Sequence, residues 1–94
     1  IDMKELWCVI ESSSEGEIFT PEFFNSREEV AAFIAKDASE CFANINDLPG
    51  ANMKVGFDDD EPLGRVWTDE YSWVWHGFEV TKEIENVLKE NNNV

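Results

Sequence analysis

The middle of the chain has the pattern of a long amphipathic helix, and this restricts the fold more than any other feature. The pattern begins with Ser26-Arg27-Glu28-Glu29, a capping box in which Ser26 accepts a hydrogen bond from the Glu29 amide and the Glu29 carboxylate reaches back. The apolar residues that follow recur at steps of three and four and share one helix face: Val30, Phe33, Ile34, Ala38, Cys41, Phe42 and Ile45. Residues 46–50 include Pro and Gly, which end the pattern. The sequence therefore predicts a helix over residues 26–44.

The segment before this helix predicts a β-hairpin. Residues 4–11 alternate with apolar side chains on both faces, which is typical of a well-covered strand. Residues 12–16 (SSSEG) are turn-forming. Residues 17–20 predict a short returning strand, which Pro21 limits because proline cannot donate to a strand ladder.

The segment after the helix predicts further strands. Residues 53–57 alternate between inward and outward positions, and residues 58–64 (DDDEPLG) predict an acidic loop. A short strand over residues 65–68 and a turn at residues 69–70 follow. The inward positions of the first of these strands are Met53, Val55 and Phe57.

The strongest strand pattern of the chain covers residues 71–80 (YSWVWHGFEV). Strict alternation would divide its large apolar residues between the two faces. A β-bulge at Gly77 would bring all of them onto one face, so we expect a bulge there. Thr81 is a suitable cap for a last helix over residues 82–90.

These elements follow one another in the order β-β-α-β-β-β-α, with mostly short antiparallel connections. The order predicts an α+β fold: a small two-layer domain in which an antiparallel sheet of four to five strands packs on one main helix. Ninety-four residues suit a single domain over residues 1–94, with residues 1–3 as a flexible or extraneous start and residues 91–94 as a frayed tail. Neither a spanning apolar run nor a signal-peptide pattern occurs, so we expect a cytoplasmic protein.

The charge of the chain limits its partners. Asp and Glu number 21 against 7 Lys and Arg, and the net charge is −14. Solubility needs only about 2 to 8 charges in a small domain, and further like charges repel one another in the folded state. DNA, RNA and anionic membranes would also repel this chain. We therefore expect neither direct nucleic-acid binding nor membrane binding, and the composition favours a basic protein surface as partner.

The acidic residues are densest between residues 58 and 70, where six of the 21 are opposed only by Arg65. This stretch adjoins the aromatic strand, so aromatic side chains could anchor a partner beside the carboxylates. A solvated acidic loop is the simpler interpretation. The candidate partner-binding residues are Asp58, Asp59, Asp60, Glu61, Asp69 and Glu70, with Trp67 and Tyr71 as anchors.

The same stretch has a partial calcium-loop pattern. Asp59 falls at the first position of an EF-hand template and Glu70 at the twelfth, with Gly64 at the turn. Leu63 cannot be a ligand at the fifth position, and the flanking segments predict strands where an EF-hand has helices. We therefore predict no metal site and no cofactor.

The aromatic residues and the cysteines leave alternatives open. The aromatic run from Trp67 to Phe78 is either core or, in part, an exposed face that binds a partner or a second copy. Cys8 and Cys41 are either two reduced cysteines or one disulfide.

Nothing in the sequence predicts an enzyme. His76 is the only histidine, and Ser72 and Glu79 could share its face if the bulge forms. Catalysis would need these groups within hydrogen-bond reach in a pocket, and no nucleophile, metalloprotease, P-loop or dinucleotide motif occurs.

The sequence thus favours a non-catalytic acidic binding protein that occupies a basic site on a protein partner. Its carboxylates could imitate phosphates and inhibit a nuclease or a nucleic-acid-binding complex, as in phage or mobile-element counter-defence or toxin immunity. The alternative is a small soluble accessory domain that forms a homodimer through its sheet.

Overall fold

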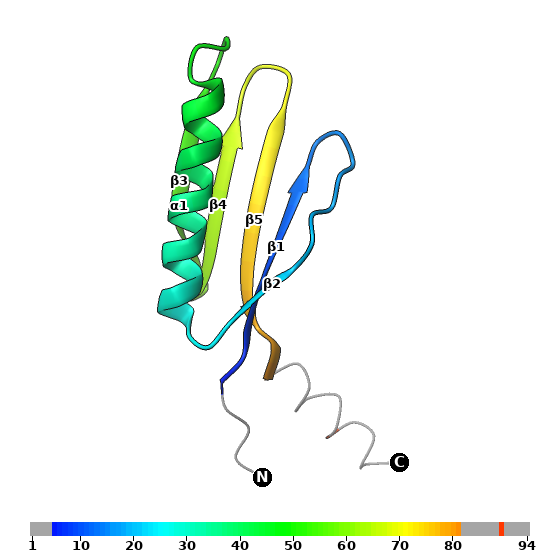
Figure 1. Cartoon of the computed structure of the whole chain (residues 1–94), viewed down its shortest axis with the longest axis vertical. Coiled ribbons are helices and arrows are strands. Elements are labelled where there is room, and N and C mark those ends of the chain that lie inside the picture. The colour runs from blue at the N-terminus through cyan, green and yellow to red at the C-terminus, as the bar shows by residue number, and fades with distance from the viewer. Residues whose placement is uncertain (1–4, 82–88, 90–94) are drawn as a thin grey trace.

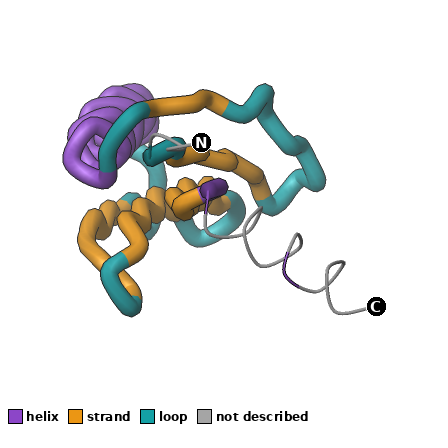
Figure 2. The backbone as a smooth tube through the Cα atoms, turned by 90° about the horizontal axis from the view of Figure 1, so that it is seen from below, coloured by secondary structure: helices purple, strands orange, loops and turns teal. Residues whose placement is uncertain are grey.

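The protein forms one sheet and one long helix in a computed structural model that describes residues 5–81 and 89. All neighbouring strands pair antiparallel, in the order β2-β1-β5-β4-β3. Helix α1 lies along one face of the sheet, which bends around it (Figures 1 and 2). The predicted two-layer α+β fold is therefore confirmed. The elements are β1 (Trp7–Ser13), β2 (Glu22–Phe24), α1 (Arg27–Ile45), β3 (Asn52–Asp58), β4 (Glu61–Trp67) and β5 (Ser72–Glu79).

Helix α1 begins and ends where the sequence pattern predicts. The Glu29 amide donates to Ser26 Oγ at 3.2 Å, and the Glu29 carboxylate accepts from the Asn25 amide at 2.9 Å. The cap therefore forms, but the carboxylate reaches one residue further back than the capping-box pattern predicts. The predicted helix over residues 82–90 lies outside the described residues, apart from Lys89.

The core lies between α1 and the middle of the sheet. Val30, Ile34 and Ala38 are fully buried on the helix and pack against a cluster that includes Trp75 and Val66. The remaining members of the predicted apolar stripe pack at the edges of this cluster, which confirms the predicted helix face: Phe33, Cys41, Phe42 and Ile45.

Two glycines allow the helix to approach the sheet closely. A β-carbon at Gly64 would overlap a methyl group of Ile34, and one at Gly77 would overlap a methyl group of Val30. Gly77 also pairs regularly with Val9, within a β1–β5 ladder that continues without interruption from Trp7 to Ser13. The predicted bulge at Gly77 is therefore wrong, because the position holds glycine to admit the helix.

The regular ladder distributes the residues of β5 by strict alternation. Trp73, Trp75 and Gly77 face α1, and their neighbours Phe78 and His76 face the other side of the sheet. The aromatic run is thus divided between the core and the uncovered face, which the sequence had left open.

The predicted returning strand over residues 17–20 is also wrong. Only an isolated bridge between Ser12 and Ile18 forms there, and regular pairing resumes after Pro21, where β2 pairs with β1. Proline supplies no N–H, so pairing is interrupted at that point.

The predicted short strand over residues 65–68 is part of a longer strand, β4, and a tight hairpin replaces the predicted acidic loop over residues 58–64. The hairpin turn consists of Asp59 and Asp60, whose φ angles are 49° and 68°, and β4 already begins at Glu61. Aspartate tolerates the left-handed conformation that a two-residue hairpin turn requires. The sequence therefore concealed a turn of two residues inside what reads as a longer loop.

The two cysteines are free and lie on opposite sides of the sheet. Cys41 is on α1, whereas Cys8 alternates with Trp7 and Val9 of the core and so points away from the helix. The disulfide alternative is therefore excluded by the fold.

Candidate functional site

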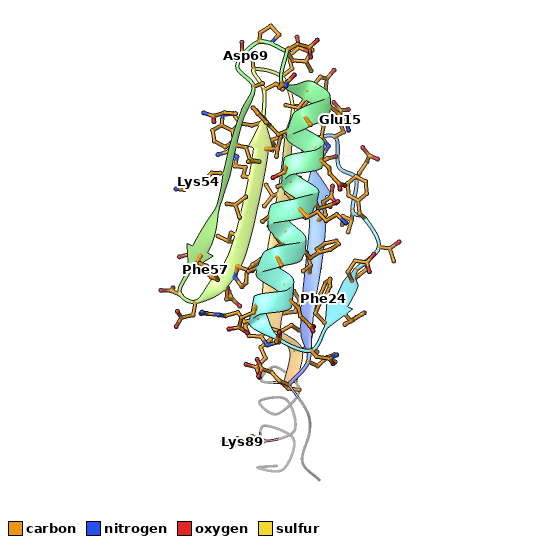
Figure 3. All side chains as sticks on the ribbon, turned by 60° about the vertical axis from the view of Figure 1, so that its left-hand side comes forward. Glu15, Phe24, Lys54, Phe57, Asp69 and Lys89 are labelled. Atoms are coloured by element: carbon orange, nitrogen blue, oxygen red, sulfur yellow. The ribbon has the colours of Figure 1, made fainter. Side chains whose placement is uncertain are left out.

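The structure separates the predicted partner-binding residues into two groups. Asp58, Asp59, Asp60 and Glu61 form the β3–β4 hairpin at one end of the sheet, whereas Asp69, Glu70 and Tyr71 lie in the β4–β5 connection. The seven residues of β4 stand between them, a length of about 20 Å. In Figure 3, Asp69 is at the top of the molecule and Phe57, beside the hairpin, is near the opposite end. The eight residues do not form one surface.

Asp69 and Glu70 belong to an end of the molecule built from three loops, which we call the three-loop end: residues 14–17, 46–50 and 68–71. The Asp69 amide donates to the Pro49 carbonyl at 3.0 Å and so joins the second and third loops. Ser14 and Ser72 exchange two hydrogen bonds of 2.9 and 3.0 Å, which join the first loop to the end of the third.

Further hydrogen bonds fix the loop that carries Asp69 and Glu70. The Thr68 amide donates to the Tyr71 carbonyl at 2.8 Å, and Thr68 Oγ1 accepts from the amides of Glu70 and Tyr71 at 3.2 and 2.9 Å. Gly50, at φ 75°, lies so close to Asp69 that a β-carbon there would overlap its carboxylate. The carboxylates of this loop are therefore held on a hydrogen-bonded backbone.

The three-loop end is acidic and partly apolar. Its loops contain no Lys, Arg or His. The second and third loops line a cleft of about 330 Å³ between Leu48 and Tyr71. These two side chains are 42% and 39% exposed, as interaction anchors must be. The carboxylates of this end are Glu15, Glu17, Asp47, Asp69 and Glu70.

The hairpin end is partly neutralised by its surroundings. Arg27 Nη1 lies 3.3 Å from an oxygen of Asp60, and its guanidinium also stacks on Phe57. His76 Nε2 lies 3.1 Å from Glu61 Oε1. The hairpin therefore presents less unopposed negative charge than the three-loop end.

The calcium-loop pattern does not correspond to a loop. Asp59 is in the hairpin turn and Glu70 follows β4, so its first and twelfth positions are at opposite ends of a strand. Within residues 5–81 and 89, no group of three or more Asp, Glu, His or Cys side chains is placed to hold a metal ion.

Trp67 lies on the side of the sheet opposite α1, which we call the open face. The open face of β3, β4 and β5 is identified by alternation from Gly64, which faces the helix. The Arg65 guanidinium stacks on the Trp67 ring at 4.7 Å, so this tryptophan is occupied by a cation of its own chain. The open face carries Asn52, Lys54, Gly56, Asp58, Glu61, Leu63, Arg65, Trp67, Ser72, Val74, His76 and Phe78.

The catalytic grouping of His76 with Ser72 and Glu79 does not form. Glu79 alternates onto the helix side of β5, where its carboxylate accepts from Thr81 Oγ1 at 2.6 Å. Ser72 is four residues from His76 along the strand, a distance of about 13 Å.

Sequence reasoning missed a pair of carboxyl groups between β1 and α1. Burial, and then the nearby Asp37 carboxylate, raise the pKa of Glu11 to about 7. Asp37 accepts a hydrogen bond from the indole of buried Trp75 at 2.8 Å. The alternation of β1 could have predicted that Glu11 faces the helix, because Glu11 follows Trp7 and Val9 on the same face of the strand.

The carboxyl pair lines a cleft of about 380 Å³ whose walls include Phe19, Phe33 and Glu22. Burial, with Glu11 and Asp37 adding to it, also raises the pKa of Cys41. This thiol is therefore held in its protonated, less nucleophilic form. The cleft combines a carboxyl group of raised pKa with acidic walls but offers no activated nucleophile.

Comparison with protein-family models, curated proteins and solved structures found no match to this chain. Among the described residues, no helix is both long enough and apolar enough to cross a membrane.

Proposed function

We propose that this chain is a non-catalytic acidic protein that binds a basic site on a protein partner through its three-loop end. One observation carries the proposal: five carboxylates from three loops meet at one end, with no basic residue in those loops. This surface includes three of the partner-binding residues predicted from the sequence: Asp69, Glu70 and Tyr71. Asp58, Asp59, Asp60 and Glu61 contribute to long-range attraction from the other end.

The physical basis is electrostatic complementarity to a positive surface. An excess of one charge steers an oppositely charged partner toward the site and accelerates association. Hydrogen bonds that fix the loops reduce the conformational entropy lost on binding. Exposed Leu48 and Tyr71 supply apolar contacts beside the carboxylates.

The partner class follows from the same chemistry. Carboxylates on a fixed surface can occupy sites that normally hold phosphates, so the partner is a nuclease or another nucleic-acid-binding protein, and the outcome is its inhibition. Counter-defence of a phage or mobile element and toxin immunity are two settings for such an inhibitor.

The test is affinity capture with three forms of the protein. Asp47→Asn/Asp69→Asn/Glu70→Gln neutralises the three-loop end, and Glu22→Gln/Glu28→Gln/Glu40→Gln removes the same charge from exposed positions elsewhere. We expect the original chain and the control variant to capture a partner that the three-loop variant does not capture. The affinity of the three-loop variant for the purified partner should be at least about tenfold weaker than that of the original chain.

Salt and competition then test the mode of binding. Affinity should fall as NaCl rises from about 50 to about 500 mM, because the charges are screened. Duplex or single-stranded nucleic acid should compete with this protein for the partner. The proposal would be contradicted if both triple variants lost the same affinity for the partner, or if the affinity did not depend on salt.

A further inference from the structure

The open face has an unusual arrangement of like charges. Lys54 of β3 is directly opposite Arg65 of β4, and Asp58 of β3 is directly opposite Glu61 of β4. Directly opposed side chains share a face and lie about 4.5–5.5 Å apart at their β-carbons, so like charges in these positions are destabilising. The face therefore contains one basic pair and one acidic pair, each unfavourable within a single chain.

The two pairs are arranged symmetrically about a row without fixed charge. Gly56 and Leu63 are paired midway between them, and His76 of β5 pairs with Leu63. Each charged pair is two residues, about 7 Å, from this row. A half-turn about an axis that runs along this row, parallel to the plane of the sheet, turns the sheet over and exchanges the position of the basic pair with that of the acidic pair.

We propose that the open face binds the open face of a second copy of this chain, forming a two-fold symmetric dimer. In this dimer, Lys54 and Arg65 of each copy lie over Asp58 and Glu61 of the other. A two-fold interface must be self-complementary. This arrangement of charges is self-complementary, because each basic pair meets the acidic pair of the other copy. The dimer goes beyond the function proposed above and uses none of the residues of the three-loop end.

The local charge permits this contact in a chain that otherwise repels itself. The four charged residues of β3 and β4 on this face sum to zero, although the whole chain carries −14. Two copies therefore meet no net repulsion from these four residues, and the opposed pairs add attraction. Figure 3 shows Lys54 extending outward from β3, away from α1.

The shape of the open face supports face-to-face packing. A shallow hollow of about 420 Å³ lies over Gly56, with Leu63, Arg65 and Val74 around it. Apart from Gly56 and its two chain neighbours, no described residue has an atom within 4 Å of where a β-carbon of Gly56 would be, and Val74 is 38% exposed. Two sheets pack about 10 Å apart, a separation that Lys and Arg side chains can bridge.

Charge exchange tests the dimer with the full chain. Sedimentation equilibrium should give a dimer whose dissociation constant rises at least about tenfold in Lys54→Glu/Arg65→Glu and in Asp58→Lys/Glu61→Lys. An equimolar mixture of these two variants should form a heterodimer, because one face is then wholly acidic and the other wholly basic. The quadruple variant that combines all four changes should form the homodimer again.

The control is Lys36→Glu/Lys89→Glu, which changes the net charge equally at exposed positions outside the face. It should leave the dissociation constant within about twofold. Far-UV circular dichroism checks that every variant is folded. Three outcomes would overturn the proposal. The original chain could stay monomeric at all concentrations up to about 1 mM, or both face variants could retain the dimer. The third outcome is that the mixture of the two face variants and the quadruple variant both stay monomeric. None of these outcomes depends on whether the basic partner exists.

Discussion

Glu11 shows how a single residue can act against the stability of the native state. Its carboxyl group is partly buried beside Asp37, so ionisation is unfavourable in the folded protein. Its pKa is 4.5 in the reference state and about 7 here. The protonated form therefore stabilises the fold below about pH 4.5, and this contribution is lost as the pH rises through 7.

Glu11→Gln is expected to increase stability at alkaline pH only. Glutamine has the shape of the protonated acid and donates to Asp37 without carrying a charge. Allowing for solvent screening at this partly exposed position, the free energy of unfolding should rise by about 1–2 kcal/mol at pH 8.5 and by less than about 0.5 kcal/mol at pH 5. Urea titrations at both pH values measure this.

The control for this prediction is Glu40→Gln, which removes the same charge from an exposed position on α1. Its effect should be small and similar at both pH values. If Glu11→Gln raised the free energy of unfolding equally at pH 5 and pH 8.5, ionisation of Glu11 would not be the cause of the effect.

The elements are positioned by how closely the helix can approach the sheet. Gly64 and Gly77 form a shallow depression into which Ile34 and Val30 fit. The pattern of β5 alone favoured a bulge at Gly77, because a sequence does not show which glycine lies under a helix. The role of this glycine depends on Val30 of α1, which is 47 residues earlier in the chain.

Gly64→Ala should therefore destabilise the protein by about 1–3 kcal/mol, because the added methyl group overlaps Ile34 in a fully packed core. Gly56→Ala is the matched control, since it adds the same group to a neighbouring strand with open space around it. Its effect should lie within about 0.5 kcal/mol. Thermal unfolding at low micromolar concentration compares the two, and equal destabilisation would show that helix approach is not what selects glycine at position 64.

The whole molecule is governed by its charge. Seventeen of the 21 acidic residues lie within residues 5–81, with only four Lys and Arg in the same range. Among the described residues, the only ion pair between permanently charged side chains is that of Arg27 with Asp60, and Glu61 has the His76 ring as its neighbour. Most of the repulsion is therefore opposed by solvent and salt rather than by partners within the chain.

Added salt should stabilise this protein. Raising NaCl from about 20 mM to about 500 mM shortens the Debye length below most separations between exposed carboxylates. The midpoint of thermal unfolding should rise by about 4–8 °C, which corresponds to about 1 kcal/mol for a domain of this size. Glu22→Gln/Glu28→Gln/Glu40→Gln should show a smaller rise. An unchanged or falling midpoint would contradict self-repulsion as the dominant electrostatic effect.

Much of the fold follows from local patterns. The capping box and apolar stripe determine α1, and alternation determines β1 and its two faces, because these signals depend only on nearby residues. The returning strand and the loop before β4 were predicted at the wrong residues, because local signals do not report which strands pair. Local turn signals do not specify where pairing resumes after Pro21, nor that Asp59 and Asp60 alone turn the chain.

The site depended on tertiary structure far more than the fold did. The sequence by itself determined that the chain is acidic, that its carboxylates are concentrated between residues 58 and 70, and that one main helix packs on an antiparallel sheet. Only the tertiary structure decided that β4 separates those carboxylates into two ends, that Glu11 meets Asp37, and that two like-charge pairs share one face. Proximity across strands is set by register and chain path, and no pattern within a single segment contains either.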